Sequence, residues 1–384
     1  MTQNRPIYLD YAATTPVDPR VAEKMHYCLA LEGPFGNSTS HHSFGQEARQ
    51  LIEGAREAVA HLLQTVSRNI IFTSGATEAN NLAIKGIVAG YPDRGKHLIT
   101  CRTEHKAVLD VFRYLETQGY SVTYLDPKPN GLVDCDVLNS TIRADTVLVS
   151  IMHVNNETGV IQDINRILQT TRERGVFLHV DAAQSLGKIA INLQQLPVDL
   201  LSFSAHKFYG PKGIGGLYVG DSPRVRLVSQ SHGGGQERKL RAGTLATHQI
   251  VGMGEACRLA AELMSDENRK IQQFRDQFWQ GIGSVPGLYL NTEECSVVPH
   301  ILNVRFSGLS KAVLLERLQG LAISFASACN TLDLEPSHVL RAMGYSEEEA
   351  RSSIRFSFGR FTTEFEIQKA ITLIRERFIG GLCE

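Results

Sequence analysis

The sequence predicts a large α/β domain built on a mostly parallel sheet, together with a smaller α+β domain. From about residue 50 to 220, short apolar runs rich in β-branched residues alternate with amphipathic helical stretches. This alternation is typical of parallel strands that are covered by helices on both faces. The 384 residues are enough for one large core and one smaller core.

The expected elements follow in order along the chain. Strands of the large domain are predicted at residues 69–72, 97–100, 121–125, 146–152, 176–180, 200–204 and 214–219, with helices between them, for example at 77–88 and 106–117. Functional groups in such sheets lie at the carboxyl ends of the strands.

The second half of the chain predicts the smaller domain. A glycine-rich loop at 231–244 precedes a long helix at 248–282, which we expect to be interrupted near Ser265. Strands are expected at 299–306 and 352–358, and helices at 311–318 and 363–378, the last with a Thr363–Glu366 capping box. We expect a large domain at 15–262 and a small domain made of 1–14 and 263–384.

Composition excludes several classes of protein. Apolar residues make up 42% and charged residues 21%, and 39 basic against 40 acidic residues leave a net charge of -1. No basic surface therefore indicates nucleic acid as a partner. No apolar run approaches the roughly 18 residues of a membrane span, and the start lacks a signal peptide, so we expect no membrane contact and a cytoplasmic location. The seven cysteines are scattered and odd in number, which predicts neither a metal site nor disulfides.

The most informative residue is Lys207, which follows the apolar strand ending at Ser204 and lies next to His206. A half-buried lysine beside polar groups can lose its proton and form a Schiff base, above all with pyridoxal phosphate. Taken alone, a lysine at a strand end is more often a plain surface residue.

A second motif, Thr73-Ser74-Gly75-Ala76-Thr77-Glu78, follows the strand at 69–72 and opens a helix. Its small residues leave backbone N–H groups free at the positive end of the helix, where a phosphate can bind. No Gly-Lys-Ser/Thr closes the turn, so it is not a nucleotide-binding P-loop. The alternative is an ordinary helix cap.

Three further strand ends carry polar groups. Asp181 could keep a pyridine nitrogen protonated, Gln184 and Asn156 could reach the ring's phenolic oxygen, and His105 could stack on a flat ring and move protons. Each could instead be a turn residue or a structural histidine. All five strand ends are expected on one edge of one sheet, and this combination outweighs the separate alternatives.

These residues, together with the stretches Tyr8-Leu9-Asp10-Tyr11-Ala12-Ala13-Thr14-Thr15, Met152-His153-Val154-Asn155-Asn156-Glu157 and His232-Gly233-Gly234-Gly235-Gln236-Glu237-Arg238, make the chain resemble the cysteine desulfurases of the NifS/IscS type. These are fold-type I pyridoxal phosphate enzymes. The resemblance covers nearly the whole chain.

The resemblance implies a role for each matching position. Lys207 would hold pyridoxal 5'-phosphate as a Schiff base and move the α-proton, with His105 stacked on the ring, Asp181 at the pyridinium, and Gln184 and Asn156 near the phenolic oxygen. The phosphate would lie against Ala76, Thr77, Ser204 and His206. Thr244 would complete the phosphate site of a neighbouring subunit, which implies a homodimer. Arg355, with Asn156, would bind the substrate carboxylate.

Cys329, in Ser327-Ala328-Cys329, matches the family's sulfur-accepting nucleophile. The implied reaction converts L-cysteine to L-alanine and leaves a persulfide on Cys329. That sulfur would pass to an acceptor such as an iron–sulfur scaffold, for iron–sulfur cluster assembly or for thiolation. Such a thiol needs a lowered pKa and an accessible loop.

The sequence departs from the family pattern around this cysteine. Phe325 and Ala326 stand where a Ser-Gly pair is usual, and Asn330-Thr331-Leu332-Asp333 replaces a run of small residues. A loop with less glycine should be stiffer, so we expect an altered delivery of sulfur. The chain also ends at Glu384 without the usual tail that docks a scaffold, and the loop at Asn37 lacks a proline. These changes leave the acceptor open.

Two other readings stay open at this point. A selenocysteine lyase or an aminotransferase of the same fold would share the cofactor site, but an aminotransferase has no use for Cys329. A non-catalytic platform that keeps the fold for docking is the alternative from another class of protein.

Overall fold

The computed structural model describes residues 5–221, 225–292, 295–325 and 335–379. The predicted nucleophile Cys329 therefore lies outside the described residues, as do Ala326 and the stretch 330–333.

The larger sheet has seven strands in the described part of the chain, in the order β2-β8-β7-β6-β5-β3-β4. They are β2 (Ile70–Thr73), β3 (His97–Cys101), β4 (Ser121–Leu125), β5 (Thr146–Met152), β6 (Phe177–Asp181), β7 (Leu200–Ser204) and β8 (Gly215–Val219). Neighbours from β7 to β4 pair in parallel, whereas β8 is antiparallel to both β7 and β2. The predicted mostly parallel sheet is confirmed, and no strand end moves by more than one residue.

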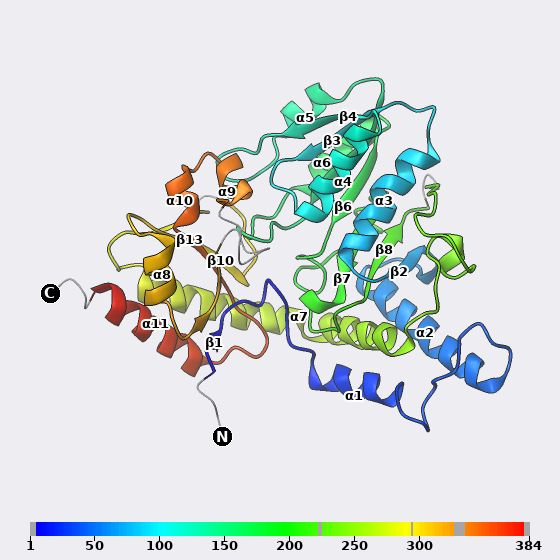
Figure 1. The fold of residues 1–384 in the computed structure, drawn as a ribbon, viewed down its shortest axis with the longest axis horizontal. Coiled ribbons are helices and arrows are strands. Elements are labelled where there is room, and N and C mark those ends of the chain that lie inside the picture. The colour runs from blue at the N-terminus through cyan, green and yellow to red at the C-terminus, as the bar shows by residue number, and fades with distance from the viewer. Residues whose placement is uncertain (1–4, 222–224, 293–294, 326–334, 380–384) are drawn as a thin grey trace.

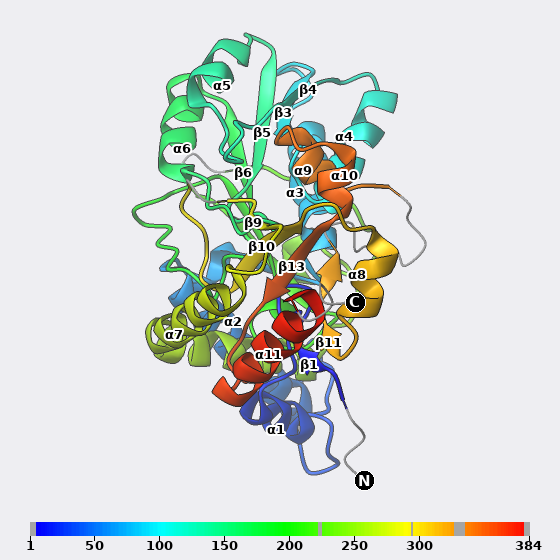
Figure 2. The same cartoon turned by 90° about the vertical axis from the view of Figure 1, so that its left-hand side faces the viewer.

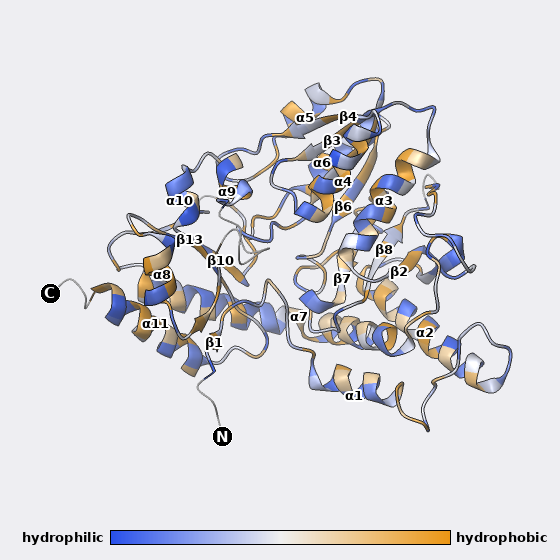
Figure 3. Ribbon diagram, viewed as in Figure 1, coloured by the Kyte–Doolittle hydropathy of each residue, from blue (hydrophilic) through white to orange (hydrophobic). Residues whose placement is uncertain are grey.

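Helices cover both faces of this sheet (Figure 1). On one face, α3 (Ala76–Gly90) and α4 (Lys106–Thr117) bury residues such as Leu82 and Phe112. On the other face lie α2 (Ser43–Leu62), α6 (Ile164–Glu173) and the first half of α7 (Thr247–Ile282). Because both faces are covered, β5 is buried at all its positions, which explains its continuous apolar run. Figure 3 shows the strands of the larger sheet coloured by hydropathy, with orange for hydrophobic residues.

A second core belongs to a smaller antiparallel sheet in the order β12-β13-β10-β9. Its strands are β9 (Leu288–Leu290), β10 (Ile301–Phe306), β12 (Ser324–Phe325) and β13 (Ser353–Ser357). The second half of α7 packs beside α11 (Glu364–Ile379) under this sheet, as Figure 2 shows from that side. The expected capping box at the start of α11 is confirmed, because Thr363 and Glu366 exchange hydrogen bonds.

Short helices and strands complete the described fold, most of them packed against one of these two cores. They are β1 (Ile7–Tyr8), α1 (Pro19–Tyr27), α5 (Cys135–Thr141), α8 (Lys311–Arg317), β11 (Leu321–Ala322), α9 (His338–Ala342) and α10 (Glu347–Arg351). Strand β1 pairs in parallel with β11, so the N-terminal segment joins the smaller core before it runs on toward the larger sheet.

The expected interruption of the long helix at Ser265 is wrong, because α7 is one continuous helix of 36 residues. Serine is only a moderately poor helix former, and Ser265 faces solvent. On either side of it the helix is buried, by residues such as Leu259 in the larger core and Ile271 in the smaller one. Packing at both ends therefore outweighs the local preference.

Candidate active site

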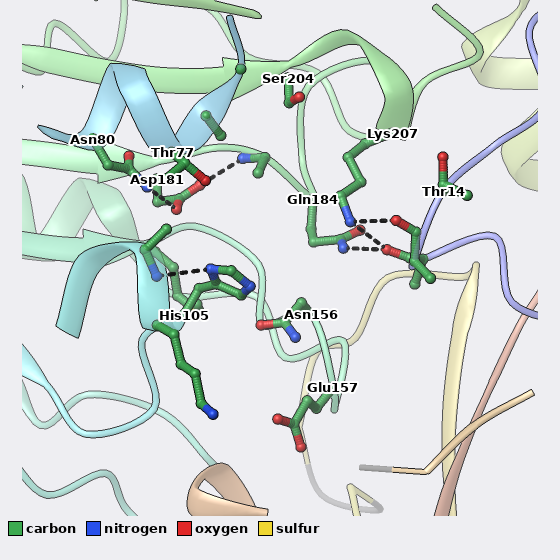
Figure 4. Close-up of a pocket in the computed structure, with 18 of the residues that line it drawn as sticks. Thr14, Thr77, Asn80, His105, Asn156, Glu157, Asp181, Gln184, Ser204 and Lys207 are labelled. Carbon is green, nitrogen blue, oxygen red and sulfur yellow. Dashed lines mark hydrogen bonds between the residues drawn. The ribbon is translucent and has the colours of Figure 1, made fainter. Parts of the chain in front are cut away.

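One cavity of about 750 Å³ lies at the carboxyl ends of the strands of the larger sheet (Figure 4). The structure brings most of the predicted site residues together in its wall: Ala76, Thr77, His105, Asn156, Asp181, Gln184, Ser204, His206, Lys207 and Arg355. Thr244 is exposed and is not part of this wall within the single chain. Apart from Arg355, these side chains lie at or after separate strand ends of the larger sheet, because parallel strands all finish at one edge.

Lys207 lies in a single 3₁₀ turn, Ala205–Lys207, directly after β7. Its Nζ donates hydrogen bonds of 2.8 Å to the backbone carbonyls of Ala12 and Ala13 (Figure 4). Gln184 donates to the same Ala12 carbonyl at 2.8 Å. Lys207 is thus held by neutral acceptors at the cavity wall, a position from which its amine can react with a carbonyl compound.

Asp181 is the last residue of β6 and is 5% exposed. One carboxylate oxygen accepts 2.8 Å from the side-chain amide of Asn80, and the other accepts 2.9 Å from the backbone N–H of Ala183. The two donors fix the orientation of the carboxylate toward the cavity. A buried carboxylate held in this way suits a protonated ring nitrogen.

His105 is the N-cap of α4, and its Nδ1 accepts 3.1 Å from the backbone N–H of Ala107. In the neutral ring the proton is therefore carried by Nε2. Burial lowers the pKa of His105, although the charge of Asp181 opposes this effect. A neutral, oriented imidazole in the cavity wall suits stacking on a flat ring.

The turn that the sequence predicts to bind phosphate, residues 73–78, joins β2 to α3. Gly75 is the N-cap, with φ at 153°, and no side chain caps the N–H groups of the first turn. Ser204 lies next to it, since a Cβ added at Gly75 would lie 3.5 Å from the Ser204 hydroxyl. The first turn of α3 therefore offers free donors at a positive helix end.

His206 lies close to this turn in the cavity wall, and its ring contacts the Thr14 hydroxyl at 3.1 Å. Burial lowers the pKa of His206 to about 4, helped by the positive charges of Lys207 and Lys212. At neutral pH the ring is therefore uncharged and can donate one hydrogen bond.

Arg355 reaches the cavity from β13 of the smaller sheet. Its Nη1 donates 2.7 Å to the carbonyl of Asn156, and its Nη2 donates 2.8 Å to the carboxylate of Asp10. Its Nε is buried and has no partner among the described residues. A buried guanidinium that keeps donors free fits an arriving carboxylate.

Several residues of this site were not assigned a role by the sequence. Asp10, Ala12 and Ala13 come from the N-terminal segment, and Asn80 lies one turn beyond Thr77 on α3. The i, i+3 spacing of Thr77 and Asn80 could have indicated that they share a face of that helix. The N-terminal residues lie in a stretch that contributes to the family resemblance, but nothing local in the sequence assigned them a contact in the site.

Glu157 is a further buried member of the wall. Its carboxylate accepts a hydrogen bond of 2.5 Å from Ser337, which also caps α9. Burial raises the pKa of Glu157 to about 7, although the Ser337 hydroxyl and the charge of Arg355 act against this rise.

These side chains fit pyridoxal phosphate. Lys207 supplies an amine, Asp181 a fixed carboxylate, His105 a flat neutral ring, and the uncapped first turn of α3 a place for phosphate. The donor set thus matches the aldehyde, pyridine ring and phosphate of that cofactor.

Two other findings concern the described residues alone. No three metal-binding side chains come together in them, and no helix among them is both long and apolar enough to cross a membrane. Cys28, Cys101, Cys135 and Cys257 are buried free thiols, and Cys295 is a partly exposed one.

Comparison with known proteins gives a consistent result. Residues 7–370 match the family model described as aminotransferase class-V. The cysteine desulfurase IscS of Pectobacterium atrosepticum is 56% identical over 98% of this chain and 93% of its own length. The cysteine desulfurase IscS of Colwellia psychrerythraea is 57% identical over 96% of this chain and 92% of its own length.

Solved structures extend this likeness to the fold. A NifS-like protein superposes with a TM-score of 0.90 at 36% identity, covering 98% of this chain and 100% of its own. A structure described as SspA in complex with cysteine gives a TM-score of 0.83 at 39% identity, over 93% of this chain and 99% of its own.

Proposed function

The chain belongs to the aminotransferase class-V family, and from this premise we propose that it is a pyridoxal phosphate-dependent cysteine desulfurase that converts L-cysteine to L-alanine. The observation that carries the proposal is one cavity that holds Lys207, Asp181 and Arg355 together. The relatives named cysteine desulfurase, which match nearly the full chain, support the same reaction.

When bound, pyridoxal phosphate draws electrons from the Cα of an amino acid, so that bonds at Cα and Cβ become easier to break. Lys207 would hold the cofactor covalently and then carry the α-proton on its Nζ. Asp181 would keep the ring nitrogen protonated, while Asn80 and Ala183 keep its carboxylate in place. His105 would pack against the ring, and Gln184 and Asn156 would donate near its phenolic oxygen.

The other residues of the cavity wall would orient the phosphate of the cofactor and the carboxylate of the substrate. The phosphate would receive hydrogen bonds from the first turn of α3, Ser204 and the neutral His206. Arg355 would bind the carboxylate of L-cysteine through its free donors, held in place by Asp10 and the Asn156 carbonyl. Binding of the substrate carboxylate by Arg355 would restrict the orientation of the substrate, and therefore the position of its thiol.

Sulfur transfer requires a second thiol, and we assign this role to Cys329. Its thiolate would attack the sulfur of bound cysteine, forming an S–S bond while the C–S bond breaks. The electron pair of that bond stays on the carbon, which takes up a proton and becomes the methyl group of alanine. The products are L-alanine and a persulfide on Cys329, so no external oxidant or reductant is needed.

The proposal also includes a partner subunit, an acceptor protein, an altered sulfur delivery step and a cellular location. Thr244 is exposed, which fits a role at the phosphate site of a second subunit in a homodimer. The IscS names of the relatives support delivery of sulfur to an acceptor protein for iron–sulfur assembly. The altered residues around Cys329, Phe325 among them, make an altered sulfur delivery step the expected difference. A cytoplasmic location stays a prediction of the sequence.

The test is a visible spectrum of the purified protein before and after L-cysteine, with alanine measured in parallel. Wild type should show a cofactor band that changes on adding cysteine, and it should form alanine. Cys329→Ala should keep the band but form no persulfide, Lys207→Ala should lose the covalently held cofactor, and Cys295→Ala is the matched thiol control. A band that changes without alanine in wild type would overturn the assigned reaction.

A further inference from the structure

A segment outside the catalytic wall, residues 236–244, adopts an unusual backbone. Glu237, Arg238 and Lys239 have φ values of 41°, 57° and 66°, the left-handed region that side chains other than glycine seldom enter. Three such residues in a row persist only where the surrounding structure holds them. The contacts of this segment must therefore hold the backbone in this conformation.

A buried ion pair holds this segment against the larger sheet. Both terminal nitrogens of Arg56 lie 2.8 Å from the carboxylate oxygens of Glu237, and the two side chains are 6% and 1% exposed. One oxygen of Glu237 also accepts 2.7 Å from the backbone N–H of Phe72, and Arg56 donates 2.9 Å to the carbonyl of Ile70. Phe72 and Ile70 belong to β2, the strand that leads directly into the phosphate-binding turn.

A second ion pair joins the same segment to the turn itself. The Glu78 carboxylate accepts 2.6 Å from the backbone N–H of Ser74 with one oxygen and 3.1 Å from Arg241 Nε with the other. Burial favours the neutral form of Glu78, but the hydrogen bonds from Ser74 and the charge of Arg241 outweigh it and lower its pKa. Glu78 therefore carries a full negative charge, and it lines the cavity.

A negative charge in the wall of a phosphate site repels the phosphate unless a positive charge neutralises it. Among the described residues, Arg241 is the cation paired with Glu78, and the Arg56–Glu237 pair fixes the segment that carries Arg241. We propose that Arg241 is a positioning residue that, by neutralising and orienting Glu78, sets the affinity of this site for the phosphate group of the cofactor. This inference rests on the proposed function, because it concerns the same cofactor.

The experiment compares binding of pyridoxal phosphate and pyridoxal, which lacks the phosphate, to cofactor-free protein by absorbance titration. Arg241→Ala should weaken binding of pyridoxal phosphate by about tenfold, the effect of one uncompensated charge near a solvated cavity. Binding of pyridoxal should not change. Arg241→Lys should keep most of the affinity, since the charge remains.

The decisive variant is Arg241→Ala combined with Glu78→Gln. Removing both charges should restore the affinity for pyridoxal phosphate to near the wild-type value, which a merely structural role of Arg241 would not do. Arg258→Ala, in a surface ion pair on α7, is the matched control and should change neither affinity. Glu237→Gln does not serve as a test here, because breaking a buried pair can prevent folding.

The outcomes separate the two proposals. Wild type that fails to bind pyridoxal phosphate would overturn the proposed function and this inference together. Wild type that binds it, with an Arg241→Ala variant that loses affinity for both compounds equally or that Glu78→Gln fails to rescue, would overturn the inference alone.

Discussion

The side-chain amide of Asn80 donates a hydrogen bond of 2.8 Å to the carboxylate of Asp181, 101 positions further along the chain. The contact joins helix α3 to the end of β6 inside the cavity wall. The side-chain oxygen of Asn80, Oδ1, is buried and has no hydrogen-bond partner among the described residues. The position of Asn80 thus leaves its own oxygen unsatisfied while its amide group orients the carboxylate of Asp181.

Replacing Asn80 should weaken the contact that we propose between Asp181 and the cofactor. We expect Asn80→Ala to lower the rate of alanine formation by about tenfold, as is typical when a group that orients a ligand's partner is removed. The visible band of the bound cofactor should shift as well. Asn139→Ala, an exposed asparagine on α5, is the control. A variant with the rate and spectrum of wild type would show that Asp181 needs no such support.

Arg355 should govern binding of cysteine more than its conversion. Lysine keeps the charge but cannot form two parallel hydrogen bonds, so Arg355→Lys should raise KM for L-cysteine by about tenfold to a hundredfold with a smaller effect on kcat. Steady-state kinetics measure both constants. Arg305→Lys, on β10 of the same sheet and paired with Glu349, is the matched control. An unchanged KM with a collapsed kcat would contradict the assignment.

His179 should make stability fall as the pH is lowered. It is fully buried between Ser150 and Ser202, and burial lowers its pKa from 6.5 to about 4. Between these values the unfolded chain binds the proton and the folded protein does not, so the stabilisation is complete above pH 6.5 and is lost on going down to pH 4. The contribution is on the order of 3 kcal/mol at most.

The measurement is the melting temperature at pH 7.5 and at pH 5. His179→Gln should be less stable at pH 7.5, through lost contacts, but its melting temperature should fall less between the two values. His61→Gln changes an exposed histidine and should keep the wild-type pH dependence. Equal slopes in all three proteins would refute the role of His179.

Glu157 should have the opposite effect on the stability of the protein, which should fall as the pH rises. Burial raises its pKa from 4.5 to about 7, so the unfolded chain ionises first as the pH rises, and stability is lost between pH 4.5 and pH 7. Glutamine can still accept from Ser337 but cannot ionise. Glu157→Gln should therefore melt at a higher temperature than wild type at pH 8 and at nearly the same temperature at pH 4.5.

Ser337→Ala tests the contact itself. It should destabilise wild type by about 1 kcal/mol or more, because the hydroxyl both donates to Glu157 and caps α9.

If Glu157→Gln lowered the melting temperature at pH 8, the buried carboxyl would be stabilising in its ionised form and the expected sign would be wrong.

The larger sheet could be predicted well because its pattern is local. Strands β4, β5 and β7 and helix α4 lie where the sequence places them, since each is a short apolar or amphipathic run bounded by turn residues. The helices α1 and α2 were not predicted. The break expected in α7 was wrong because local preference at Ser265 yields to packing on two cores.

The same distinction between local and long-range features applies to the residues of the candidate site. Side chains at a strand end or just after it, such as Asp181 and Lys207, could be placed together because parallel strands share one edge. The carbonyls of Ala12 and Ala13, which hold the Lys207 amine, could not, because their position depends on the pairing of β1 with β11 at the other end of the chain. Contacts of this kind arise only from the folded whole.

The unbroken course of α7 has a consequence for how substrate size could change. At about 1.5 Å per residue, its 36 residues form a rod of about 54 Å that is embedded at one end in the core beneath Lys207 and at the other in the core beneath Arg355. A single residue inserted near Ser265 would change the rotational phase of everything beyond it by about 100°. If Lys207 holds the cofactor and Arg355 the substrate carboxylate, as we propose, the spacing between these two groups depends on the length of one helix. Selection for a longer substrate would then have to act on side chains in the cavity instead.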